Sequence, residues 1–98
     1  MISVKEAVTS AISFLTDLMA QTGSPISDIR VEEVELDDKS TPDTWVITLS
    51  FKRTSENQVA YEQMTGQAAA PREYKVLTLT AEDGEVLSMK MASQAGAA

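Results

Sequence analysis

The chain opens with apolar residues spaced three and four positions apart, which is the spacing of an amphipathic helix. At about 100° per residue they form one stripe, and charged and hydroxyl side chains fill the opposite side. Ser3 precedes the stripe and Glu6 follows three positions later, the spacing of a capping box. Gly23 favours a left-handed helix stop. The pattern predicts a helix over 4–21 that buries Val4, Ala7, Val8, Ala11, Ile12, Phe14, Leu15, Leu18 and Met19.

Four later segments carry the alternation that is typical of strands, and it predicts strands over 29–37, 45–53, 72–81 and 85–91. The clearest is "WVITLSFKR", in which Trp45, Ile47, Leu49 and Phe51 share one face. In "IRVEEVEL" the alternation slips by one residue at Glu32-Glu33. A β-bulge there would place all four apolar side chains on one face: Ile29, Val31, Val34 and Leu36. Without a bulge, the strand is two-faced.

The segment "REYKVLTLTAEDGEVLSMKM" reads as a hairpin. A three-residue loop Glu82-Asp83-Gly84, with Gly84 left-handed, sets Leu79 opposite Leu87 and Leu77 opposite Met89. This register keeps the apolar face whole, with Met91 at its end. It places Tyr74 and Val76 on the opposite face.

Together these elements predict a single α+β domain over residues 1–91. One N-terminal helix packs on a four-stranded antiparallel meander sheet. Segment 54–71 has neither a strand nor a helix period, which predicts a long loop, and the tail 92–98 offers nothing to bury and is expected to be disordered.

The composition argues against most chemistry. The chain has 15 acidic and 8 basic residues, a net charge of −7, which disfavours binding to nucleic acid. It has no histidine and no cysteine, so the commonest general base, nucleophile and transition-metal ligands are missing. The segment "ELDDKSTPD" lacks the glycine and ligand spacing of a calcium loop. We therefore expect no enzyme activity, no cofactor and no metal.

The N-terminus does not combine a basic start with an apolar run, so no secretory signal is predicted. No stretch approaches the ~18 apolar residues of a membrane-spanning helix. With no cysteine in the chain, these features favour a cytoplasmic protein.

The sheet face opposite the helix is the predicted binding surface. Apolar side chains standing among Thr and Ser suit a partner contact. We expect Val46, Tyr74, Val76 and Val86 to form it, extended by Tyr61 and Met64 from the long loop. The expected partner is another protein, and homodimerisation through this face is the simplest form.

The order of a leading helix, a Val/Glu strand, "TWVITLSF" and "YKVLTLTAEDGEVLSMKM" resembles the PepSY-like and cystatin-like small α+β domains over residues 3–91. Tyr74-Lys75-Val76 and Asp83-Gly84-Glu85-Val86 match their Tyr-x-Val strand and Gly-Glu-Val hairpin. The resemblance implies a domain that binds or inhibits other proteins, often peptidases, usually outside the cytoplasm.

Two alternatives remain open. The Trp45 strand and the Gly84-Glu85 hairpin are also similar to the O-type accessory proteins of gas vesicles, which implies a structural subunit of a larger assembly. Those proteins usually continue into a basic, aromatic tail, where this chain has "ASQAGAA". The acidic composition is also that of a mimic that binds a nucleic-acid-binding protein.

Overall fold

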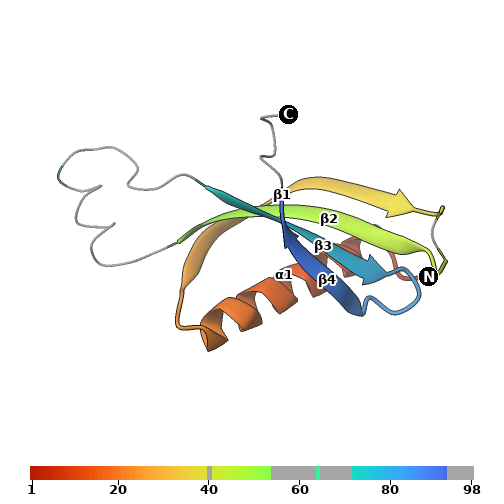
Figure 1. The fold of residues 1–98 in the computed structure, drawn as a ribbon, viewed down its shortest axis with the longest axis horizontal. Helices are drawn as coiled ribbons and strands as arrows, with labels where there is room; N and C mark the ends of the chain where they lie inside the picture. Colours follow the sequence, from red (N-terminus) through yellow and green to blue (C-terminus); the bar gives the residue numbers. More distant parts are fainter. Residues whose placement is uncertain (40, 54–63, 65–71, 93–98) are drawn as a thin grey trace.

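A computed structural model describes residues 1–39, 41–53, 64 and 72–92. Within them, one helix, α1 (Val4–Gln21), packs against one face of a four-stranded antiparallel sheet (Figure 1). The strands follow one another in the order β1-β2-β3-β4, which confirms the predicted α+β meander. Their bounds are β1 (Ile26–Asp37), β2 (Thr44–Arg53), β3 (Glu73–Thr80) and β4 (Val86–Met91).

Helix α1 begins and ends where the sequence pattern predicts. Ser3 Oγ accepts a hydrogen bond from the Glu6 amide and Glu6 Oε1 accepts one from the Ser3 amide, both at 3.1 Å, which closes the capping box. Gly23 is left-handed, with φ 73°. The predicted buried stripe is too wide, because Val4 is 47% and Phe14 38% exposed. The fully covered positions recur every fourth residue: Ala7, Ala11, Leu15 and Met19.

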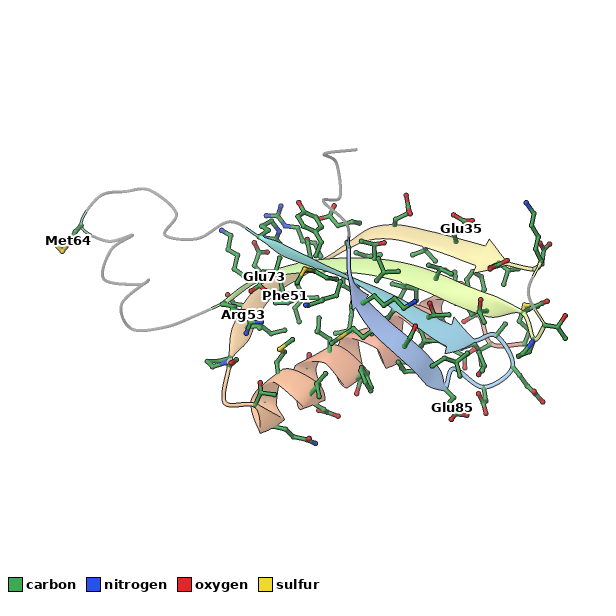
Figure 2. The ribbon with its side chains drawn as sticks, in the orientation of Figure 1. Glu35, Phe51, Arg53, Met64, Glu73 and Glu85 are labelled. Carbon is green, nitrogen blue, oxygen red and sulfur yellow. The ribbon has the colours of Figure 1, made fainter. Side chains whose placement is uncertain are left out.

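The core lies between this helix and the inner residues of β2 and β3. Ile47 of β2 stands opposite Leu77 of β3, and both are completely buried, as are Leu49, Leu79 and Phe51. Figure 2 shows Phe51 on the side of the sheet that α1 covers. Burial of each such side chain contributes about 1.5–3 kcal/mol of hydrophobic free energy.

Of the two alternatives for β1, a bulge at Glu32-Glu33 or a two-faced strand, the structure shows the bulge. Val31 pairs with Leu49 and Glu33 pairs with Thr48, so Glu32 is the extra residue between them. Downstream of it, Val34 packs against the core and Leu36 is half-buried.

The start of β1 departs from the prediction. The strand begins at Ile26 rather than Ile29, and a second register shift lies between Ser27 and Arg30. Because a bulge bends its strand, Ile29 still packs against the core while Val31, predicted to be buried, is 43% exposed.

The hairpin confirms one predicted pair and corrects the other. Leu77 pairs with Met89, and Gly84 is left-handed with φ 78°. Leu79, however, pairs with Val86, because the Thr80 amide donates to the Glu85 carbonyl (2.9 Å) and so closes a four-residue loop.

The extra residue needed to restore the Leu77–Met89 pair is Leu87, which is 53% exposed rather than buried. Met91, also predicted to face the core, is 78% exposed at the end of the edge strand. Val86 packs against the core beneath α1, so its predicted place on the uncovered face is wrong.

Two predicted segments fall mainly outside the described residues. Of the loop 54–71 only Met64 is described, and of the tail 92–98 only Ala92. The Ala92 amide donates to the Tyr74 carbonyl (3.1 Å), which extends the β3–β4 ladder by one residue beyond Met91.

Candidate functional site

The candidate site is the sheet face that α1 leaves uncovered, hereafter the open face. The register aligns its positions across the strands: Val46 lies between Glu35 and Thr78, and Thr48 lies between Glu33 and Val76. Because successive residues point to opposite faces, these side chains stand opposite the buried row of Ile47 and Leu49.

Three of the predicted binding residues lie on this face. Val46, Tyr74 and Val76 are all half-buried, and Tyr74 pairs with Ser50 at one end of the row. Val86 belongs to the core side instead. The structure thus brings together the predicted residues of β2 and β3 and removes the one from β4.

The predicted loop contacts do not join them. Tyr61 lies outside the described residues. Met64 is 86% exposed, and Figure 2 shows it beyond the ends of the strands.

The two hydroxyl residues in the centre of the open face are buried, although no other element of the described structure packs on that face. Thr48 is 8% exposed and Ser50 is fully buried. The hydroxyls at the centre of the face are thus covered by their neighbours, whereas Val46 and Val76 keep part of their surface in contact with water.

Charge is distributed unevenly across the open face. Glu33 and Glu35 of β1 line one side, and Lys90 of β4, paired with Val76, lies on the other. Figure 2 shows Glu35 directed away from the α1 side. The face therefore has an acidic border, an apolar and hydroxyl centre and a basic residue opposite.

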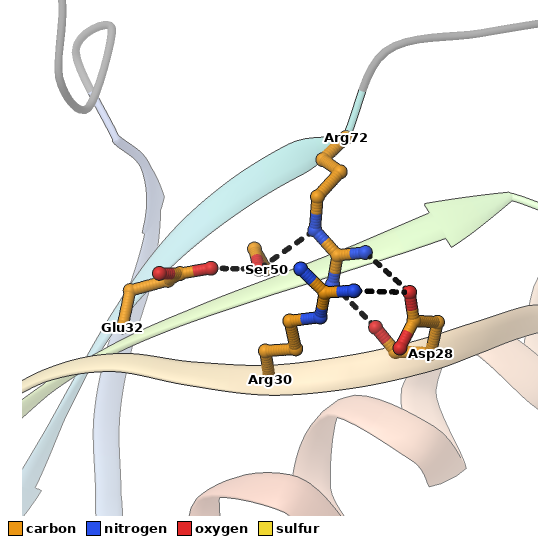
Figure 3. Close-up of polar contacts among 5 residues, drawn as sticks. All are labelled: Asp28, Arg30, Glu32, Ser50 and Arg72. Atoms are coloured by element: carbon orange, nitrogen blue, oxygen red, sulfur yellow. Dashed lines mark hydrogen bonds and ion pairs between the residues drawn. The ribbon is translucent and has the colours of Figure 1, made fainter. Parts of the chain in front are cut away.

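A polar cluster of Asp28, Arg30, Glu32, Ser50 and Arg72, hereafter the Asp28 cluster, closes one end of the open face (Figure 3). Arg72 Nη1 lies 2.7 Å from Asp28 Oδ2, and Arg72 Nη2 donates to the Asp28 carbonyl. Arg72 Nε donates to Ser50 Oγ at 3.0 Å. Ser50 Oγ in turn donates to Glu32 Oε2 at 2.5 Å. The cluster ties β1, β2 and the residue before β3 together.

The local backbone of β1 aims the two carboxylates of this cluster. Asp28 has φ 53°, a left-handed conformation that Asp tolerates better than most residues. Glu32 is the bulged residue, and its carboxylate reaches Ser50 on β2. The two irregularities of β1 therefore supply the acceptors of the cluster.

The cluster is built for structure rather than for ligand chemistry. All three guanidinium nitrogens of Arg72 already donate to protein acceptors, and the Asp28 carboxylate compensates its charge. The hydrogen bond from Arg72 holds the pKa of Asp28 below its ordinary value. Ser50 is fully buried, so its hydroxyl is not accessible to a substrate.

Sequence reasoning missed this cluster, although it located the bulge at Glu32. Asp28 and Arg72 are 44 positions apart, and neither belongs to a recognisable motif. The one local signal is the phase slip at Glu32-Glu33, which indicates that a glutamate there leaves the regular alternation.

A hollow of about 330 Å³ lies at the end of α1, away from the open face, lined by Thr16, Met19, Ala20, Gly23, Pro25 and Ile26. Ligand pockets of this size usually hold a few convergent polar groups. Thr16 is the polar side chain in this lining, so the hollow offers little to orient a small molecule.

Among the residues with described positions, no three carboxylates gather in a group that can hold a metal ion. Among the same described residues, no helix is both long enough and apolar enough to cross a bilayer. Comparison with protein-family models, with curated proteins and with solved structures finds no match to this chain.

Proposed function

We propose that this domain is a non-enzymatic binding module whose open face docks another protein. The observation that carries the proposal is the row of half-buried apolar side chains, Val46, Val76 and Tyr74, held in one register on β2 and β3. Such side chains lose their remaining contact with water when a partner covers them, which stabilises the complex.

The borders of the face define the partner's chemistry. Glu33 and Glu35 call for basic groups on the partner, and Lys90 calls for an acidic or polar one. Tyr74 suits the edge of such a contact, since it buries its ring while keeping its hydroxyl paired. The partner is thus a protein with an apolar centre flanked by a basic margin.

The resemblance to PepSY-like and cystatin-like domains supports the same class of function. We place the interaction in the cytoplasm, because a chain without cysteine suits a reducing compartment. The inhibitory form of the proposal has a peptidase as the partner.

The proposal is tested with Val76→Lys. Affinity capture from the native cell with residue-level cross-linking identifies the partner, and the purified pair is then titrated. A lysine at the centre of the contact is expected to weaken binding at least about tenfold, because it places an unpaired charge in the interface. Val31→Lys, a matched change at an exposed site beside the core row, should bind like the parent.

A charge-reversal pair tests the acidic border separately. Glu33→Lys with Glu35→Lys is expected to slow association with the partner. The control, Glu82→Lys with Glu85→Lys, makes the same charge change at the exposed β3–β4 turn and should leave the association rate unchanged. Equal binding by all of these variants would exclude the open face. Turnover of a substrate, abolished by one Asp or Glu substitution in a folded protein, would overturn the non-enzymatic assignment.

A further inference from the structure

The outer edge of β4 is a second surface, distinct from the open face. β4 is the last strand in the sheet order, and Figure 1 shows no described strand alongside its outer edge. Lys75 pairs with Met91, so the next residue, Ala92, stands opposite Tyr74. The Ala92 amide donates to the Tyr74 carbonyl (3.1 Å), which makes these two a hydrogen-bonded pair. Hydrogen-bonded and non-bonded pairs alternate in an antiparallel ladder. Lys90 therefore turns its backbone groups toward β3, whereas Met89 and Met91 turn theirs outward.

This edge also carries the most exposed apolar side chains of the sheet. Leu87 is 53% and Met91 78% exposed. An unpaired strand edge that displays apolar side chains is a template for another strand.

The side of α1 that faces the hairpin carries one exposed aromatic side chain, Phe14. A methyl group on Gly84, in the β3–β4 turn, would lie 3.3 Å from Ser10 Oγ, so this side of the helix faces the hairpin. Phe14 lies one turn further along the same side and is 38% exposed.

We propose that a second copy of this chain pairs with β4 through this edge, antiparallel and about a two-fold axis at Met89. The pairing sets Met89 opposite its own counterpart and Leu87 opposite Met91 of the second copy. It covers both exposed apolar side chains at once and joins the two sheets into one, with the helices on the same side.

Charge selects this register. A two-fold axis at Lys90 would set the two Lys90 side chains directly opposite each other, which is unfavourable. An axis at Met89 sets each Lys90 opposite Ser88 instead, and it uses the outward backbone groups of Met89.

The other free edge is a poorer partner for β4. β1 has two register shifts, and its regular part, residues 33–37, carries exposed glutamates. Its apolar residues Val34 and Leu36 are already half-buried in their own subunit and do not cover Leu87 or Met91. Pairing of β4 with β1 is also head-to-tail and grows into a filament rather than a closed dimer.

The test is the mass of the purified chain by light scattering over a concentration series up to about 1 mM. The parent is expected to reach twice its 10.6 kDa. Leu87→Lys with Met91→Lys should raise the dimer dissociation constant at least about tenfold, because two charges then occupy the apolar contact. Val4→Lys with Val31→Lys adds the same charge at exposed apolar sites elsewhere and should dimerise like the parent.

Single cysteines test the register, since the chain has none of its own. Met89→Cys should form a disulfide-linked dimer, because opposed residues of a hydrogen-bonded pair lie about 5.5 Å apart between Cα atoms, within disulfide range. Leu87→Cys alone should not, because its counterpart is displaced by four residues, or roughly 14 Å. Leu87→Cys mixed with Met91→Cys should cross-link.

A single-chain mass at every concentration overturns the proposal, and so does a filament. A dimer that survives Leu87→Lys with Met91→Lys but dissociates with Val76→Lys assigns self-association to the open face and also overturns it. Loss of partner binding by Val76→Lys with the dimer intact supports both proposals independently.

Discussion

At the level of single residues, Gly84 shows how closely the hairpin and the helix meet. Its φ of 78° is unfavourable for a residue with a side chain, and a Cβ there would lie 2.9 Å from Ile2 Cδ1. Gly23 has nearly the same φ, 73°, with nothing within 4 Å of the added atom. Substitutions at Gly23 and Gly84 therefore share the same backbone strain, and only the one at Gly84 adds a steric clash.

Gly84→Ala is therefore expected to destabilise the fold more than Gly23→Ala. The left-handed conformation costs about 1–2 kcal/mol at either site, and Gly84→Ala adds the displacement of Ile2. Urea unfolding monitored through Trp45 fluorescence measures both variants. Equal midpoints would mean that the flexible end of Ile2 moves aside without cost.

At the level of elements, the Asp28 cluster connects β1 to β2 and β3 near the start of β1, where the pairing of β1 with β2 is irregular. The first two residues of β1, Ile26 and Ser27, pair regularly with β2, and the ladder is then interrupted until Arg30. Arg72 bridges this interruption by its contacts to Asp28 and Ser50. Part of the β1–β2–β3 geometry therefore depends on the ionisation of one carboxylate.

This dependence predicts a pH effect. Because Arg72 holds the pKa of Asp28 below its ordinary value of 3.8, the ionised carboxylate stabilises the fold above that value. The contribution is lost as the pH falls through 3.8 toward the folded-state pKa. Asp28→Asn is expected to be less stable than the parent near pH 7, and the difference should shrink as the pH falls below 3.8.

Urea midpoints measured over that pH range test this prediction. Asp17→Asn, at an exposed position of α1, corrects for the loss of one negative charge. A difference between Asp28→Asn and the parent that stays constant down to the lowest pH would show that ionisation of Asp28 is not the cause.

At the level of the whole molecule, a net charge of −7 opposes the proposed dimer. Two copies repel one another, and salt screens this repulsion, with a Debye length of about 10 Å at 0.1 M. The β4 contact itself is apolar and carries no carboxylate. Added salt therefore weakens the repulsion between the two copies without weakening any ion pair in the contact.

The dimer dissociation constant is accordingly expected to fall as sodium chloride is added from low concentration to about 0.1 M. Sedimentation or light scattering at fixed protein concentration reports the change. Weaker association at higher salt would instead indicate ion pairs between copies, such as Lys90 with the glutamates of β1.

Elements whose causes are local can be predicted from the amino-acid sequence. The helix over 4–21 follows from a spacing of three and four and from the Ser3/Glu6 capping box, and both are properties of neighbouring residues. The alternation in β2, the bulge at Glu32 and the left-handed Gly84 are likewise local, since side-chain period and backbone freedom act within a few residues.

Features that depend on residues far apart in the sequence emerge only in the folded chain. The hairpin register follows from the Thr80–Glu85 closure, which places Val86 in the core and Leu87 outside. The contacts of Arg72 with Ser50 and with Asp28 join residues 22 and 44 positions apart. Such contacts depend on how the strands lie beside one another in space, and a pattern read within a few residues does not contain that information.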